Sequence, residues 1–216
     1  MTRPARLRLG VAVAGTLMCV AAACAPGSGN ASANAHALPP NDKPAIERVF
    51  APALDRLGVR LTRASLVDLQ TGKPSANGTH LAVYVEPTGD YAAEDYARGT
   101  VRTLGAFIPA AFEQWGGLTS FDICQEPLPS VDSRPEPPPV TKVDLTKEAA
   151  RKMRWDELDL ARLLRDAKRF GSKALTVYAM PDVRQTSVYQ DADMKANTAG
   201  SATTSSPPPT SPSYDR

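Results

Sequence analysis

Two stretches of β-prone residues, Leu81–Glu86 (LAVYVE) and Ser120–Gln125 (SFDICQ), determine the expected fold because a long helical pattern lies between them. From Gly89 to Trp115 apolar side chains recur at roughly the helical period. Pro109 lies inside this pattern and lacks a backbone donor, which predicts a kink or a short break. The order strand–helix–strand predicts a βαβ unit.

A second strand–helix–strand pattern follows. Val140–Leu145 (VTKVDL) predicts a strand, and Thr146 can cap a short helix that runs through Met153. A longer helix is expected from Asp156 to Phe170, and Ala174–Met180 (ALTVYAM) predicts the last strand. Two such units in series predict an α+β fold, a ferredoxin-like split βαβ sheet with its helices on one face.

Two further elements precede the first unit and are expected as additions to this plan. Apolar residues at helical spacing predict a helix over Pro44–Leu57, which Gly58 can end. Ala64–Leu69 (ASLVDL) predicts a strand, and the turn-rich sequence QTGKPSANGTH joins it to Leu81–Glu86. The simplest arrangement of these two strands is an antiparallel hairpin.

A proline-rich segment, residues 126–139 (EPLPSVDSRPEPPP), joins the two units. Proline cannot donate to a strand ladder, so this segment is expected to be an extended internal loop and not a central strand. An extended proline-rich segment is a preformed ligand for other proteins. The expected partner contacts are Pro135, Pro137, Pro138 and Pro139.

The amino terminus has the pattern of an export signal. Arg3, Arg6 and Arg8 precede fifteen uncharged residues, Leu9–Ala23, which end in small side chains. A helix needs roughly 20 apolar residues to cross the hydrocarbon core, so this stretch is short for a membrane span. A positive start, a short apolar stretch and a small-residue end predict a cleaved signal peptide.

The end of this stretch, Ala21-Ala22-Ala23-Cys24, resembles the lipobox of bacterial lipoproteins. The resemblance implies cleavage after Ala23 and acylation of Cys24, palmitate being a typical chain, at the extracytoplasmic face of the cell membrane. Two or more acyl chains anchor a protein stably where one does not. The alternatives are a plain secretory signal and an uncleaved anchor. The alanine-rich composition also resembles that of many actinobacterial lipoproteins, which implies location and nothing about activity.

These patterns divide the chain into four parts. Residues 1–23 are the signal peptide, and residues 24–43 are small and polar, as in a flexible tether. Residues 44–185 form the α+β domain. Residues 190–216 are poor in apolar side chains and rich in Ser, Thr and Pro, which predicts a disordered tail. The tail composition is also that of O-glycosylated stalks, although a solvated tail is favoured.

The charge balance argues against nucleic acid as a partner. The chain has 25 basic and 23 acidic residues, a net charge of +2. Removal of the signal peptide takes away three arginines and leaves 22 basic residues against 23 acidic ones. A nearly neutral domain lacks the basic surplus that phosphate backbones require.

The sequence offers few residues for metal or nucleophilic chemistry. His36 and His80 are the two histidines, and no Cys-x-x-Cys pair is present, so we expect no zinc or iron site and no cofactor. Cys124 has acidic neighbours, Asp122 and Glu126, which disfavour a thiolate. Strand alternation favours a buried, inert Cys124.

Four acids, Glu86, Asp90, Glu94 and Asp95, lie where a predicted strand ends and the long helix begins. Two of them could form an acid–base pair or a calcium site. Helix capping and complementation of the helix dipole explain the last three without a further assumption, and we favour that interpretation.

The sequence therefore favours a non-enzymatic, lipid-anchored envelope protein that binds or assists another envelope component, with no catalytic residue assigned. One alternative is a hydrolase that uses carboxylates or His80, with Glu86 and Asp122 as candidate acids. Another is a small-ligand carrier with a pocket between sheet and helices. The pocket of such a carrier would be lined by Tyr96, Phe107, Phe112 and Trp115.

Overall fold

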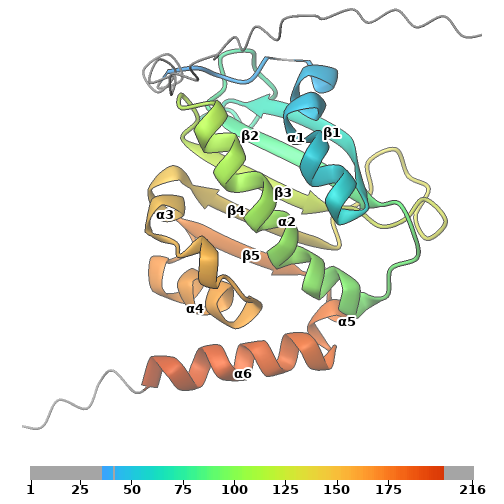
Figure 1. The fold of residues 1–216 in the computed structure, drawn as a ribbon, viewed down its shortest axis with the longest axis vertical. Coiled ribbons are helices and arrows are strands. Elements are labelled where there is room, and N and C mark those ends of the chain that lie inside the picture. Colours follow the sequence, from blue (N-terminus) through green and yellow to red (C-terminus); the bar gives the residue numbers. More distant parts are fainter. Residues whose placement is uncertain (1–35, 41, 202–216) are drawn as a thin grey trace, which may run out of the picture.

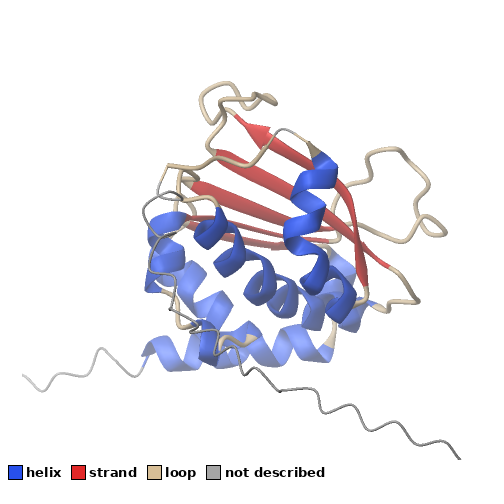
Figure 2. Ribbon diagram, turned by 45° about the horizontal axis from the view of Figure 1, so that its top comes forward, coloured by secondary structure: helices blue, strands red, loops and turns tan. Residues whose placement is uncertain are grey.

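The computed structural model describes residues 36–40 and 42–201, which form a five-stranded sheet with helices packed on one face (Figures 1 and 2). The α+β class is confirmed. The signal peptide, Ala23, Cys24 and most of the predicted tether lie outside the described residues, as do residues 202–216. The end of the tether contacts the domain, because Gly117 N donates to Ala37 O over 2.8 Å.

The sheet follows chain order, β1 to β5 from one edge to the other (Figure 1). β2 and β3 are parallel, and the other neighbouring pairs are antiparallel, including the expected β1–β2 hairpin. The strands are β1 (Val59–Val67), β2 (His80–Pro87), β3 (Ser120–Gln125), β4 (Thr141–Thr146) and β5 (Leu175–Ala179).

This order differs from the ferredoxin-like split βαβ sheet that the sequence predicts. The first unit, β2–α2–β3, places its two parallel strands side by side with no strand between them. The second unit is not a parallel crossover, since Leu145 of β4 pairs with Leu175 of β5 in antiparallel register. The connection contains two helices, α3 (Lys147–Lys152) and α4 (Leu160–Phe170), and it returns the chain to the end of the sheet that it left. β1 is likewise an integral edge strand of the sheet.

The predicted helices before and inside the first unit are present. α1 spans Lys43–Leu57 and ends at Gly58, whose φ of 63° is left-handed and favours glycine. α2 spans Ala93–Gln114 and continues through Pro109 without the predicted break. Its neighbours Phe107 and Ile108 are fully buried, so packing compensates for the missing backbone donor.

The carboxyl-terminal helix corrects the predicted tail. α5 (Pro181–Arg184) leads into α6 (Ser187–Ser201), so residues 190–201 are helical and not disordered. Ala192 and Ala196 are buried where α6 packs against α4 and α2. The small side chains of Ala192 and Ala196 allow α6 to approach α4 and α2 closely. This helix can therefore pack against the domain although its sequence contains few large apolar residues.

The helix-covered face of the sheet is mainly apolar. Val83, Ile123, Val143 and Val177 lie side by side across four strands, and all face the helices. An aromatic cluster fills the space behind them. The ring centroids of Phe50 lie 4.6 Å from Phe107, 5.7 Å from Trp115 and 6.2 Å from Phe121. Phe107 and Trp115 therefore pack in the core instead of lining a carrier pocket.

Candidate functional site

The opposite face of the sheet, which the helices leave open, carries polar side chains. The strand registers place Ala82, Asp122 and Asp144 side by side on β2, β3 and β4. β4 shows the division most clearly, because its buried residues face the helices and its partly exposed residues, Lys142 and Asp144, face away. The register therefore gathers polar groups that are far apart in the sequence, and we call this side the open face.

A cavity of about 700 Å³ lies over the open face. Its floor contains His80, Asp122, Lys142 and Asp144. The β1–β2 loop and the proline-rich loop flank the floor, since the lining also includes Leu69, Gly72, Pro74 and Glu136. The volume is in the range of small-molecule sites, and charged groups gather at the base.

Asp122 is the centre of the polar floor. The residue is 4% exposed, and its Oδ2 lies 2.6 Å from Lys142 Nζ and 3.5 Å from His80 Nε2. The other ring nitrogen of His80, Nδ1, is 2.8 Å from Ser120 Oγ, which fixes the orientation of the ring. Asp122 Oδ1 makes no hydrogen bond within the part of the chain that the structure describes.

The two aspartates of the floor differ in acidity. Burial opposes ionisation of Asp122, but hydrogen bonds from His80 and Lys142 outweigh it, so the pKa of Asp122 lies below its ordinary value. Burial, together with the negative charge of Asp122, raises the pKa of Asp144. Asp122 is thus held as a carboxylate, and Asp144 is the more readily protonated of the pair.

Arg63 connects the rim of the cavity to the proline-rich loop. Its guanidinium pairs with Glu126, lies 3.3 Å from Glu136 Oε2 and stacks 3.9 Å above the Tyr84 ring. Arg63 follows an irregularity of β1 between Leu61 and Arg63, where an extra residue interrupts the ladder. Arg63 is thus already neutralised by two carboxylates, which leaves Lys142 as the cation directed at Asp122.

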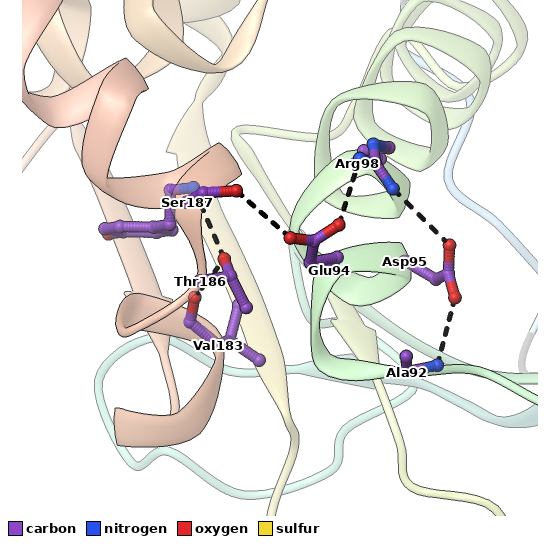
Figure 3. A network of polar contacts seen from close by, with 8 residues as sticks. Ala92, Glu94, Asp95, Arg98, Val183, Thr186 and Ser187 are labelled. Atoms are coloured by element: carbon purple, nitrogen blue, oxygen red, sulfur yellow. Dashed lines mark hydrogen bonds and ion pairs between the residues drawn. The ribbon is translucent and has the colours of Figure 1, made fainter.

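The acids that precede α2 are not part of this site. Asp95 Oδ2 accepts a hydrogen bond from Ala92 N over 3.0 Å, as a helix cap does (Figure 3). Glu94 lies 3.1 Å from Arg98 and accepts a 3.1 Å hydrogen bond from Ser187 of α6 (Figure 3). Asp95 therefore caps α2, and Glu94 lies in the first turn, where an acid complements the helix dipole.

Two other acids of that group have different positions. Asp90 is exposed and lies outside α2, whose N-cap is Ala92, so the expected cap at Asp90 is wrong. Glu86 is buried and pairs with Arg60 on the neighbouring edge strand. Glu86 is near the other three acids in the sequence. In the structure, the pairing of β1 with β2 places it opposite Arg60, so it forms an ion pair away from those acids.

Cys124 is a buried free thiol, as expected. Burial, strengthened by the charge of Asp122, raises the pKa of Cys124 to about 12. The thiol therefore stays protonated near neutral pH and is a poor nucleophile.

The prolines proposed as partner contacts are not equally accessible. Pro135 and Pro138 are exposed, Pro139 is half-buried and Pro137 is buried. The side chain of Pro137 thus packs inward, and Pro135 and Pro138 are the two that present an exposed surface.

Known proteins provide no guide to the site, since no family model, curated protein sequence or solved structure matches this chain. Within residues 36–40 and 42–201, no helix is both long and apolar enough to cross a membrane.

The sequence pattern points to His80 and Asp122 but does not mark Lys142 or Asp144. The signal that could have found them is the alternation of VTKVDL, which puts Lys142 and Asp144 on one face of their strand. Which residues lie opposite that face depends on strand order and register, which the sequence pattern does not provide.

Proposed function

We propose that this chain is a lipid-anchored, extracytoplasmic binding protein that holds a small polar ligand in the cavity of the open face. The observation that carries the binding role is Asp122, a buried carboxylate at the base of a cavity of about 700 Å³, one oxygen of which has no hydrogen-bond donor among the described residues. A buried acceptor without a donor is costly, and a bound ligand or water can supply the donor.

The proposed location rests on the sequence of the amino terminus. A positive segment, a short apolar stretch and the Ala23–Cys24 junction support export and acylation. The envelope partner remains part of the proposal, with Pro135 and Pro138 as the exposed contacts of the proline-rich loop. The anchored domain would then present both the loop and the cavity outside the cell.

The anchor is tested by the intact mass of the protein extracted from membranes. We expect a chain that begins at Cys24 and carries acyl chains, whereas Cys24→Ser should retain its signal peptide. A mature chain that begins elsewhere, or an unmodified Cys24, would contradict the anchor.

The binding role is tested by native mass spectrometry of the membrane-extracted protein. Ser65 lines the cavity from edge strand β1, so Ser65→Trp should fill the space and remove any bound small molecule seen with the wild type. Met194→Trp is the matched control, because Met194 is 60% exposed on α6. A wild-type spectrum without a bound molecule, or one unchanged by Ser65→Trp, would contradict binding in this cavity.

A second candidate function, a carboxylate-dependent hydrolase, is favoured by the opposite pKa shifts of Asp122 and Asp144. Two neighbouring carboxyl groups of different acidity can serve as base and acid. Turnover of nitrophenyl esters or glycosides that is lost in Asp144→Asn would favour the hydrolase. Binding without turnover would favour the carrier.

A further inference from the structure

Three side chains of the cavity floor converge as the ligands of a metal ion do. His80, Asp122 and Asp144 come from the adjacent strands β2, β3 and β4, and one ligand atom of each lies within 4.8 Å of the other two. Ligands about 2.1 Å from a shared ion lie at most about 4.2 Å apart. Small side-chain rotations would therefore bring these atoms into coordination distance without a change in the sheet.

A second observation points to a ligand at the same place. Asp122 is 4% exposed and its Oδ1 has no donor among the described residues. Buried polar atoms are normally paired, so this oxygen lacks a partner that a cation held between the three side chains would supply. The acidic pair alone would not define a site, but an unpartnered buried oxygen beside an imidazole does.

The imidazole is held as a metal ligand usually is. The Nδ1 atom of His80 lies 2.8 Å from Ser120 Oγ, and Nε2 faces Asp122 at 3.5 Å. A ring nitrogen that is hydrogen-bonded to a neighbouring group fixes the ring and directs the other nitrogen at the ion. Ser120 is itself buried, which keeps this arrangement rigid.

Lys142 provides the charge that a metal would replace. Its ammonium lies 2.6 Å from Asp122 Oδ2, while its side chain is 36% exposed. A half-exposed lysine can move its ammonium into water when a doubly charged ion enters. The exchange would leave two carboxylates to neutralise the two charges of the ion.

We propose that the floor binds a divalent first-row transition ion, such as Zn²⁺ or Mn²⁺, through His80, Asp122 and Asp144, with displacement of the Lys142 ammonium. This inference rests on the proposed binding role of the same cavity. One imidazole and two carboxylates suit these ions, whereas Ca²⁺ takes only oxygen ligands. The ion occupies the base of the cavity, and the remaining space admits a polar molecule that coordinates it.

The test is calorimetric titration of the full-length protein in detergent with Zn²⁺, Mn²⁺ and Ca²⁺. A His36→Ala background leaves His80 as the single imidazole. Asp144→Asn should weaken Zn²⁺ binding by about tenfold or more. Asp156→Asn is the matched control, because Asp156 is an exposed acid that does not line the cavity, and it should leave the affinity within about twofold.

Lys142→Met provides a test that does not depend on removing a ligand. The variant keeps the apolar stem and removes the competing ammonium, so Zn²⁺ should bind several-fold more tightly. Weaker binding in Lys142→Met, equal binding in Asp144→Asn, or no saturable binding by the wild type below about 1 mM would overturn the metal site. A small molecule that is bound to the wild type and lost in Ser65→Trp, together with no saturable metal binding, would refute the ion alone and leave the binding role standing.

Discussion

The two faces of one sheet differ in how they are built. The face toward the helices is mainly apolar, with Val83, Ile123 and Val143 in register behind an aromatic cluster. Its polar exception is the buried amide of Gln125, which donates to Tyr96 O and Thr100 Oγ1 of α2. On the open face Asp122 pairs with Asp144 across β3 and β4. Each aspartate is the immediate chain neighbour of a core residue, Ile123 or Val143, which also pair with one another. Apolar burial is thus concentrated on one face of the sheet, and the charged side chains of the cavity floor lie on the other. Each strand serves both, because successive side chains point in opposite directions.

The largest effect is expected on the covered face. Phe107 is fully buried and packs against the Phe50 ring, so Phe107→Ala should lower the free energy of unfolding by about 4 kcal/mol. Urea denaturation measures this loss. Phe112→Ala is the matched control on the same helix, since Phe112 is only half-buried and should cost clearly less. Equal losses would show that α2 does not present one buried face.

A smaller loss is expected where the outer helix docks. Ala196 is 2% exposed, and Ala196→Glu would place a charge between α6 and the helices beneath it, at a cost of about 2 kcal/mol. Hydrogen exchange should then accelerate in α6 while the strands remain protected. Met194→Glu changes an exposed residue of the same helix and should have little effect. Unchanged exchange in Ala196→Glu would contradict the docking of α6.

On the open face, loss of Asp122 should be destabilising at neutral pH. Asp122→Asn removes the partner of Lys142, and we expect a loss of about 2 kcal/mol, which is less than for a fully buried pair because Lys142 reaches solvent. The folded pKa of Asp122 lies below the unfolded one, so its contribution is present above the unfolded pKa and is lost as pH falls through the folded value. The stabilities of wild type and variant should therefore converge in acid, and a gap that persists there would contradict the ion pair.

The smallest effect, with the opposite sign, is expected for Asp144. Its raised pKa means that the folded protein binds this proton more tightly than the unfolded chain, so stability is lost as pH rises through the folded pKa. Asp144→Asn removes this cost and should be neutral or stabilising by up to about 1 kcal/mol at neutral pH. Denaturation at two pH values checks the sign. A clear loss at neutral pH would contradict the raised pKa.

Local patterns predicted most individual elements. The bounds of β3 agree with the predicted strand, Thr146 caps α3 through a 3.2 Å hydrogen bond from Ala149 N, and α1 begins within one residue of the predicted start. These features depend on neighbours along the chain, such as alternation, capping hydroxyls and glycine stops. The same local reasoning failed at residues 190–201, because the burial of Ala192 and Ala196 depends on distant helices.

The candidate site was less predictable than the elements that carry it. Cys124 was expected to be buried and inert, and the structure agrees, although the register places it on the open face between Tyr84 and Lys142. Asp144 was not singled out, since nothing near it in the sequence marks it as a neighbour of Asp122. The expectation of no metal site rests on the small number of histidines and cysteines in the sequence. The structure places two aspartates, Asp122 and Asp144, beside His80, and these three side chains could hold an ion.

The sequence by itself determined the β-prone strand segments and the amphipathic helices. These are short-range properties, set by backbone periods of 2 and 3.6 residues. Only the tertiary structure decided that β3 lies between β2 and β4 and that Asp122 lies opposite Asp144. Strand order and register follow from the packing of the whole chain, and a shift of one residue would turn the cluster of polar side chains toward the core.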